Sequence, residues 1–212
     1  EVITAANTFV ATIGAITEIG AKPVFVDCDN TFCMDVSMIE KKITKKTKAI
    51  VPVHLYGQSC EMEGIMNLAK KYDLKVVEDN AQAIGSIYTF SNGEKKYTGT
   101  IGDIGTTSFY PAKNLGCYGD GGAIFTNNDK LAEKIKMIVN HGENKRYHHK
   151  IIGCNSRLDS LQAVILNIKL KYLDDYNSTR RIMADNYNKA FQNIDNIQTP
   201  IKTDNSTHVY HQ

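Results

Sequence analysis

The sequence has no tryptophan, only four prolines and no apolar run long enough to cross a bilayer. Its 25 basic and 23 acidic residues leave a net charge of +2, so the chain lacks the strongly basic surface typical of nucleic-acid or anionic-membrane binding. The five cysteines are odd in number and never stand in Cys-x-x-Cys spacing, which argues against a disulfide framework or a zinc site. We therefore expect a cytoplasmic protein with reduced thiols and no nucleic-acid or membrane partner.

Several motifs of known chemistry are also missing. Ile124 stands where the third glycine of a dinucleotide-binding loop belongs, and neither a Walker loop nor a His-Glu-x-x-His pair occurs. His148 and His149 are adjacent, so they cannot share a helix face, and no metal site is expected. His54 is interpreted as a hydrogen-bonded histidine at a strand end rather than as a catalytic base.

What the chain does have is the alternation of strands and helices that marks an α/β protein. Because the predicted strands are apolar and are separated by helices, we expect a largely parallel sheet covered on both faces. The predicted strands are 2–4, 23–26, 49–53, 75–79, 106–110 and 123–126, and the predicted helices are 8–19, 37–42, 62–69, 129–138 and 161–191. The stretch 86–102 is expected to form a hairpin or loop, and 141–156 an irregular loop. Because the chain starts with a glutamate in a strand and ends in another apparent strand, we expect a fragment.

Lys113 carries the strongest chemical signal. Thr106 to Tyr110 predicts a short strand, and Pro111 ends its pairing because proline has no N–H. Lys113 follows on a tight turn, and ligands of α/β sheets bind at strand ends. A desolvated lysine there loses its proton and can condense with a carbonyl. The alternative is an ordinary solvated loop lysine, and this stretch alone leaves both interpretations open.

Asp79 is the second candidate, at the end of a predicted buried strand with Gln82 three positions further on. A carboxylate in that place is costly unless a cation meets it, which suggests that it faces the protonated ring nitrogen of a cofactor. A salt-bridged loop aspartate or a helix N-cap is the commoner alternative for a lone aspartate.

Four other residues are candidates for binding, each with a plainer alternative. The Ser108 hydroxyl can reach a phosphate or can bond to backbone. Phe9 can cover a planar ring or can belong to the core. Asn155 and Arg157 lie at the end of the 141–156 loop, where a guanidinium can bind phosphate or carboxylate in bidentate fashion or form a surface pair.

Six short stretches stand out when the chain is taken as a whole. They are Ala6–Thr12, Val51–Gln58, Val77–Gln82, Ser108–Lys113, Gly119–Ile124 and Gly153–Asp159. In this order they resemble the DegT/DnrJ/EryC1/StrS family of sugar aminotransferases, and the resemblance covers nearly the whole chain. Six motifs in the right order are far more specific than any one of them.

The resemblance implies a fold type I enzyme, similar to aspartate aminotransferase, that uses pyridoxal 5'-phosphate (PLP). Lys113 matches the lysine that bonds to the cofactor, Asp79 the partner of the ring nitrogen, and Gln82 a residue packing beside the ring. Ser108 matches a phosphate ligand, and Phe9 matches the aromatic residue over the ring face.

The resemblance also implies how the chain is organised. Residues 1–170 correspond to the PLP-binding large domain without its N-terminal part. Residues 171–212 correspond to a connecting helix and the beginning of a small C-terminal domain. Asn155 matches a residue that relatives contribute to the phosphate site of the neighbouring subunit, so a homodimer with shared active sites is expected. The family's glycine-serine phosphate loop is absent from the chain, and Asn80 replaces the small residue that is usual after the aspartate.

Substrate-side residues are implied as well. Arg157, Tyr147 and His148 resemble residues on the substrate side, and His208 and Tyr210 resemble the segment that closes over the sugar. The expected reaction moves an amino group, expected from glutamate, to a nucleotide-linked keto-sugar for surface polysaccharide or amino-sugar biosynthesis. The closest likeness is to enzymes acting on a UDP-linked 3-keto-glucuronate derivative. The alternatives are a dTDP-3-keto-6-deoxyhexose aminotransferase and a non-catalytic sugar-nucleotide-binding domain of the same fold.

Overall fold

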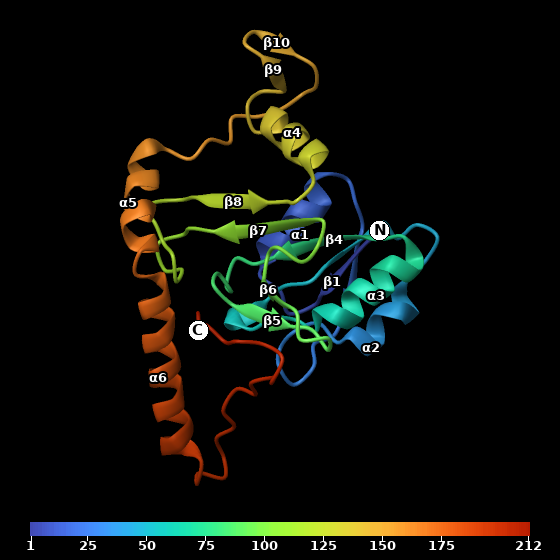
Figure 1. The fold of residues 1–212 in the computed structure, drawn as a ribbon. Coiled ribbons are helices and arrows are strands. Elements are labelled where there is room, and N and C mark those ends of the chain that lie inside the picture. The colour runs from blue at the N-terminus through green and yellow to red at the C-terminus, as the bar shows by residue number, and fades with distance from the viewer.

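A computed structural model describes residues 1–212 as a six-stranded sheet between helices (Figure 1). The strands of this sheet, in spatial order, are β2 (Pro23–Val26), β1 (Val2–Ala5), β3 (Ala49–Val51), β4 (Lys75–Asp79), β7 (Ile104–Ser108) and β8 (Gly122–Phe125). All neighbouring strands pair in parallel except β7 and β8, which are antiparallel. The predicted α/β class with a mostly parallel sheet is confirmed.

Helices and two small hairpins make up the rest of the regular structure. The α-helices are α1 (Val10–Glu18), α2 (Val36–Ile39), α3 (Met62–Tyr72), α4 (Asp129–Ile138), α5 (Ser160–Leu170) and α6 (Leu173–Phe191), with 3-10 turns η1 (Glu40–Lys42) and η2 (Leu55–Gly57). The hairpins are β5 (Ile87–Thr89) with β6 (Lys95–Tyr97), and β9 (Glu143–Lys145) with β10 (His148–His149). No helix is both long and apolar enough to cross a membrane.

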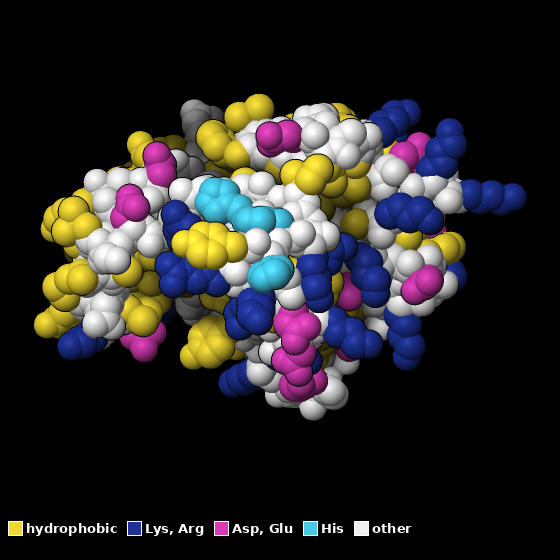
Figure 2. Space-filling model, turned by 90° about the horizontal axis from the view of Figure 1, so that it is seen from above, with side chains coloured by type: hydrophobic (Ala, Val, Ile, Leu, Met, Phe, Trp, Pro, Cys, Tyr) yellow, Lys and Arg dark blue, Asp and Glu magenta, His cyan; other side chains and the backbone are white.

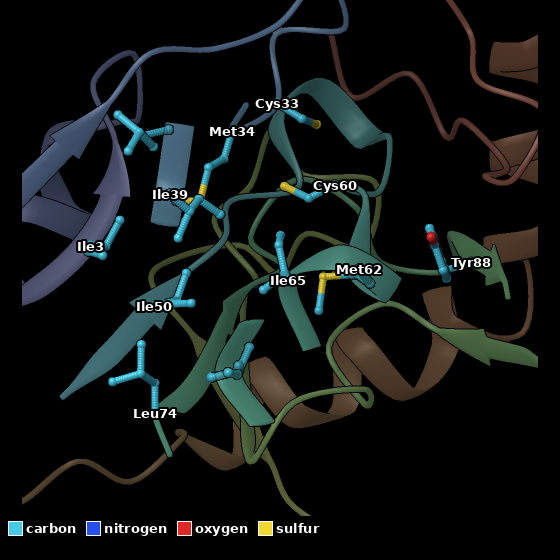
Figure 3. Packing of buried hydrophobic residues seen from close by; sticks show 14 residues of the cluster. Ile3, Cys33, Met34, Ile39, Ile50, Cys60, Met62, Ile65, Leu74 and Tyr88 are labelled. Atoms are coloured by element: carbon cyan, nitrogen blue, oxygen red, sulfur yellow. The ribbon is translucent and has the colours of Figure 1, made fainter. Parts of the chain in front are cut away.

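Alternating residues of the central strands supply two separate hydrophobic layers. Ile3, Ile50 and Val76 are fully buried and pack with Ile39 of α2 and Ile65 of α3 on one face (Figure 3). The residues next to them in sequence face α1 on the other side. That second cluster is Val2, Ile16 and Val51. A strand buried on both faces must be apolar throughout, which explains why the strand prediction succeeded.

Two predictions about helices were wrong. The first helix begins at Val10 with Phe9 as its N-cap residue, because the Thr8 hydroxyl bonds to the Thr12 hydroxyl (2.9 Å) instead of to a backbone N–H. The predicted helix over 161–191 is two helices, α5 and α6, separated at 171–172. Acidic residues in the first turn of α6 favour a new N-terminus at that point.

The chain after α6 returns across the end of the sheet. Residues 201–211 run beside β5, where the Thr207 N–H donates to the Ile87 carbonyl (2.9 Å), and then beside η2, where the Val209 N–H donates to the Gly57 carbonyl (2.8 Å). Figure 1 shows this C-terminal segment close to β5, far in sequence but near in space. It thereby reaches the edge of the sheet at which β4 and β7 end.

Candidate active site

Asp79 lies at the carboxyl end of β4, beside the carboxyl end of β7, since Asp79 pairs with Thr106 in parallel register. The hydroxyl of Thr12, on α1, donates to Asp79 Oδ2 at 2.7 Å. The Ala81 N–H donates to the other oxygen at 3.1 Å. With one donor on each oxygen, the carboxylate is held in one orientation while remaining only partly buried.

Lys113 lies on the turn that follows β7, where its N–H donates to the Tyr110 carbonyl at 2.9 Å. Burial lowers the pKa of Lys113 below its ordinary value, and the negative charge of Asp79 acts in the opposite direction. The amine and the carboxylate therefore occupy one neighbourhood, although they come from two different strand ends. A lowered pKa makes the free amine of Lys113 more accessible near neutral pH.

Gln82, three residues after Asp79, is hydrogen-bonded to Tyr56. The Tyr56 N–H donates to Gln82 Oε1 at 2.6 Å. Tyr56 has a left-handed backbone (φ 59°), an uncommon conformation for a bulky residue that often marks a functional segment. The Gln82 side chain is thus fixed through its oxygen on the stretch that leads away from Asp79.

His211 is a site residue that sequence reasoning missed. Its N–H donates to the Tyr56 carbonyl at 2.9 Å, and its Nδ1 is buried without a hydrogen-bond partner. Burial, followed by the charges of Lys113 and Arg180, lowers the pKa of His211 to about 4. A neutral imidazole therefore lies beside Lys113 with one nitrogen free. The only sequence signal was its position directly after Tyr210.

Two residues expected to bind the cofactor lie at the same edge of the sheet. Ser108 is the last residue of β7, and its hydroxyl accepts from the Tyr110 N–H at 3.2 Å. Phe9 precedes α1 and leaves 66% of its surface exposed, so it is not a core residue. No contact of the Phe9 ring fixes it over the Asp79–Lys113 neighbourhood.

His208 and Tyr210 belong to the C-terminal segment that reaches this edge. Their rings stack with centroids 3.8 Å apart and planes 7° from parallel. The Tyr210 N–H donates to His208 Nδ1 at 2.9 Å. Burial, with a smaller effect of Lys202, lowers the pKa of His208 to about 4, so this histidine is neutral near pH 7.

The remaining candidates lie elsewhere in the chain. Asn155 and Arg157 are exposed, and the Arg157 guanidinium donates to Asn140 Oδ1 at 3.1 Å. Tyr147 and His148 are on the exposed β9–β10 hairpin, which projects from one end of the molecule in Figure 1. Figure 2 looks onto that end and shows histidine side chains beside lysine and arginine side chains. None of these four residues forms a hydrogen bond or an ion pair with Lys113 or Asp79.

Glu78, the residue before Asp79 on β4, is a fully buried carboxylate. His54 Nε2 lies 2.9 Å from Glu78 Oε2, and His54 Nδ1 accepts from the Cys60 N–H at 3.1 Å. Both ring nitrogens of His54 are therefore engaged in hydrogen bonds within the core. This confirms the interpretation of His54 as a hydrogen-bonded residue at a strand end.

The donor set fits a cofactor of the PLP type. A carboxylate suits a protonated ring nitrogen, an accessible amine suits a carbonyl, and a serine hydroxyl suits a phosphate. The unpartnered buried nitrogen of His211 leaves a hydrogen-bonding position open beside the amine. The residues that would hold the group are Asp79, Lys113, Gln82 and Ser108.

Comparison with known proteins assigns this arrangement to a family. The model of the DegT/DnrJ/EryC1/StrS aminotransferase family matches residues 1–212. Over the whole chain, the sequence is 53% identical to dTDP-3-amino-3,6-dideoxy-alpha-D-galactopyranose transaminase of Aneurinibacillus thermoaerophilus, covering 57% of that protein. It is 45% identical to UDP-2-acetamido-2-deoxy-3-oxo-D-glucuronate aminotransferase of Pseudomonas aeruginosa, covering 58% of it.

A solved structure shows the same fold. The crystal structure of NtdA from Bacillus subtilis with bound cofactor PMP superimposes with a TM-score of 0.87 and 41% identity, over 99% of this chain and 47% of that one. The chain spans little more than half the length of the curated relatives that it matches.

Proposed function

The chain belongs to the DegT/DnrJ/EryC1/StrS aminotransferase family, and from this premise we propose that the complete protein is a PLP-dependent sugar aminotransferase. The observation that supports the proposal most is that Lys113 and Asp79 lie near each other. A partly buried amine with a lowered pKa lies within reach of an oriented carboxylate, at adjoining strand ends of an α/β sheet. PMP, the cofactor named for the related NtdA structure, is the amino form of PLP.

Each residue has a distinct task in this proposal. Asp79, oriented by Thr12, holds a proton on the ring nitrogen of the cofactor through its negative charge. Lys113 would hold the cofactor at its carbonyl carbon, and the amine, when free, would carry the proton of the donor's Cα. When bound, PLP supplies an electron sink for the negative charge that develops at that carbon. Gln82 limits the position of the ring, and Ser108 offers a hydroxyl to the phosphate.

For the substrate we propose a UDP-linked 3-keto-glucuronate derivative with glutamate as amino donor. The P. aeruginosa relative named for such a sugar is 45% identical over the whole chain. A carboxylated sugar needs a cationic partner, and Arg157 is an exposed guanidinium with only one neutral hydrogen bond. A dTDP-linked 3-keto-6-deoxyhexose is the second candidate, favoured by the 53% identity to the A. thermoaerophilus transaminase. Acidic and neutral sugars can be told apart by whether Arg157→Ala raises KM for one and not the other.

We further propose that two copies share their active sites. Asn155, Arg157, Tyr147 and His148 lie away from their own Lys113 on an exposed loop and hairpin, where they can complete the site of a neighbour. The basic side chains beside them suit the diphosphate of a nucleotide sugar. Following the family resemblance, we also propose that residues 1–170 are the PLP-binding large domain, that residues 171–212 are a connecting helix and the beginning of a small C-terminal domain, and that the enzyme is cytoplasmic.

Lys113→Ala in the complete protein tests the central assignment. We expect the wild type, mixed with PLP, to show an absorbance band near the visible edge that borohydride converts to a stable covalent adduct on Lys113. The variant should form no adduct and lose amino transfer by a factor of about 1,000 or more, because the proton carrier is gone. Lys70→Ala, at an exposed lysine of α3, is the matched control and should leave both properties unchanged. An adduct that persists in Lys113→Ala contradicts the proposal.

A further inference from the structure

Asn114, the residue after Lys113, is buried and joins the lysine turn to two distant segments. Its Nδ2 donates to Asn177 Oδ1 on α6 at 2.7 Å and to the Val209 carbonyl at 2.8 Å. Asn114 is 6% exposed and Asn177 is 2% exposed, so neither amide can exchange these bonds for water. Both protons of the Asn114 amide are therefore used to connect the turn to other parts of the fold.

Asn177 extends the connection to the segment that carries Gln82. Its Nδ2 donates to the Ile84 carbonyl at 3.2 Å. Gly85 has a left-handed backbone (φ 86°), and a Cβ there would lie 2.7 Å from Asn177 Nδ2. A glycine at 85 thus permits the close approach of α6. Two amides in series link the lysine turn, the helix α6 and the chain just after Gln82.

Few other interactions hold the turn from outside. Leu115 packs in a small cluster with Phe109 and with Leu173 of α6, and Lys169 of α5 donates to the Gly116 carbonyl at 2.5 Å. Leu115 and Gly116 lie on the far side of Asn114 from the lysine. The bonds of Asn114 are the polar connections nearest to Lys113 itself.

We infer that Asn114 is a positioning residue, which acts through Lys113 by holding the lysine turn against α6 and the C-terminal segment 205–211. The inference deepens the proposed function, because it concerns the amine that the function uses. Its consequence is a direct link between the C-terminal segment and the reactive amine. A displacement of Val209 or of α6 is transmitted to Lys113 through the side chain of Asn114.

Competitive acetylation of the complete protein without cofactor tests this link. The rate of modification of Lys113 is measured by mass spectrometry across pH, with Lys70 as the internal reference. Because burial is the main cause of the lowered pKa of Lys113, Asn114→Ala should admit water and raise the apparent pKa toward that of an ordinary lysine. We expect the free-amine fraction of Lys113 at a fixed pH below its pKa to fall by about threefold to tenfold as that pKa rises.

Two further variants separate positioning from general loss of stability. Asn177→Ala breaks the same bond from the helix side and should shift the pH profile in the same direction, and the double variant should add little to the larger single effect. Ser86→Ala is the matched control, because the Ser86 hydroxyl donates to the Thr207 carbonyl (2.5 Å) of the same C-terminal segment but does not touch the turn.

A Lys113 profile that is unchanged in folded Asn114→Ala and Asn177→Ala, or that shifts equally in Ser86→Ala, overturns the inference. If Asn114→Ala does not fold, Asn177→Ala alone decides, because Asn114 then keeps its bond to Val209. A wild type that forms no reducible adduct with PLP refutes the proposed function but leaves the acetylation result valid.

Discussion

Two adjacent carboxylates of β4 show how single residues divide structural and chemical tasks. Asp79 faces α1 and accepts two hydrogen bonds, and it remains partly exposed at the strand end. Glu78 faces the opposite side of the sheet, is fully buried, and accepts from His54 and from three backbone N–H groups. Strand alternation is what places these neighbours in different environments. Only Asp79 is left with room for a ligand.

Glu78 also joins segments that the site needs. Its Oε1 accepts from the N–H groups of Ile101 and Gly102, both at 2.6 Å, and its Oε2 accepts from the Gly99 N–H at 2.7 Å and from His54. Residues 99–102 lead directly into β7 and so to Ser108. Burial raises the pKa of Glu78, but the hydrogen bonds from His54 and the backbone outweigh it, and the pKa lies below its usual value.

Glu78→Gln is therefore predicted to be strongly destabilising at neutral pH. Whichever way the new amide is turned, its nitrogen faces two donors, so we expect a loss of about 3 kcal/mol or more. The free energy of unfolding in urea measures this loss directly. Glu94→Gln, at an exposed loop position, is the control and should change stability by less than about 0.5 kcal/mol.

The pH dependence of this loss has a definite sign. A carboxyl whose pKa is lowered on folding stabilises the protein above its unfolded pKa, and this stabilisation disappears as pH falls through the folded pKa. The difference between wild type and Glu78→Gln should therefore be constant from neutral pH down to about 4.5, the usual value, and should shrink below it. A difference that stays constant down to pH 3 contradicts this assignment.

At the level of single residues, the sequence pointed to Lys113 and Asp79 as candidates but not to the residues that surround them. Lys113 and Asp79 were recognisable because strand-end positions and family-like motifs coincide there. Thr12, which orients Asp79, lies 67 residues away in sequence, and His211 lies at the far end of the chain. Such contacts depend on the return of distant segments to one sheet edge. Residue type and local spacing carry no information about that return.

Among the elements, predictability followed the strength of the local pattern. The strand 75–79 was predicted with its observed bounds, and the helix predicted over 129–138 is α4, whose N-cap residue Asn128 accepts from the Leu131 N–H at 3.1 Å. The β9–β10 hairpin was predicted as an irregular loop. Its strands are polar, exposed and at most three residues long, so no alternation of hydrophobic residues marks them. The hairpin depends instead on its base at Gly142.

Gly142→Ala is predicted to loosen this hairpin without unfolding the protein. Gly142 has a left-handed backbone (φ 77°), and a Cβ there would overlap the Ile151 carbonyl oxygen. The exposed hairpin contributes little to the core, so the free energy of unfolding should change by less than about 1 kcal/mol. Limited trypsin digestion should cut after Lys145 or Arg146 about tenfold faster than in the wild type.

Gly93→Ala is the matched control for that digestion. Gly93 also has a left-handed backbone (φ 84°), but nothing lies within 4 Å of the position that its Cβ would take. An alanine at 93 is therefore strained by the left-handed conformation, as an alanine at 142 is, but it does not overlap any neighbouring atom. Cleavage within 143–150 should be unchanged in this variant. An equal acceleration in both variants would show that the hairpin does not depend on the base at Gly142.

At the scale of the whole molecule, the arrangement of the candidates points beyond one chain. The cofactor-side residues gather at the carboxyl edge of the sheet, whereas Asn155 and Arg157 lie on an exposed loop that leads into α5. One face of α5 carries apolar side chains at helical spacing that are more than half exposed. They are Leu161 at 69%, Val164 at 58% and Ile168 at 56%. An apolar stripe beside the exposed residues Asn155 and Arg157 is the pattern expected of a surface that a second copy covers.

Replacing two residues of this stripe tests the proposed dimer. We expect Leu161→Glu/Val164→Glu in the complete protein to weaken self-association by about 100-fold or more, because two charges per subunit must be desolvated at the interface. Sedimentation velocity over a range of concentrations measures the change, and amino transfer should fall in parallel if each site needs residues of the other copy. Met38→Glu, on α2 at 40% exposure, is the control and should leave the dimer intact. A double variant that remains dimeric, or a monomer with full activity, contradicts shared active sites.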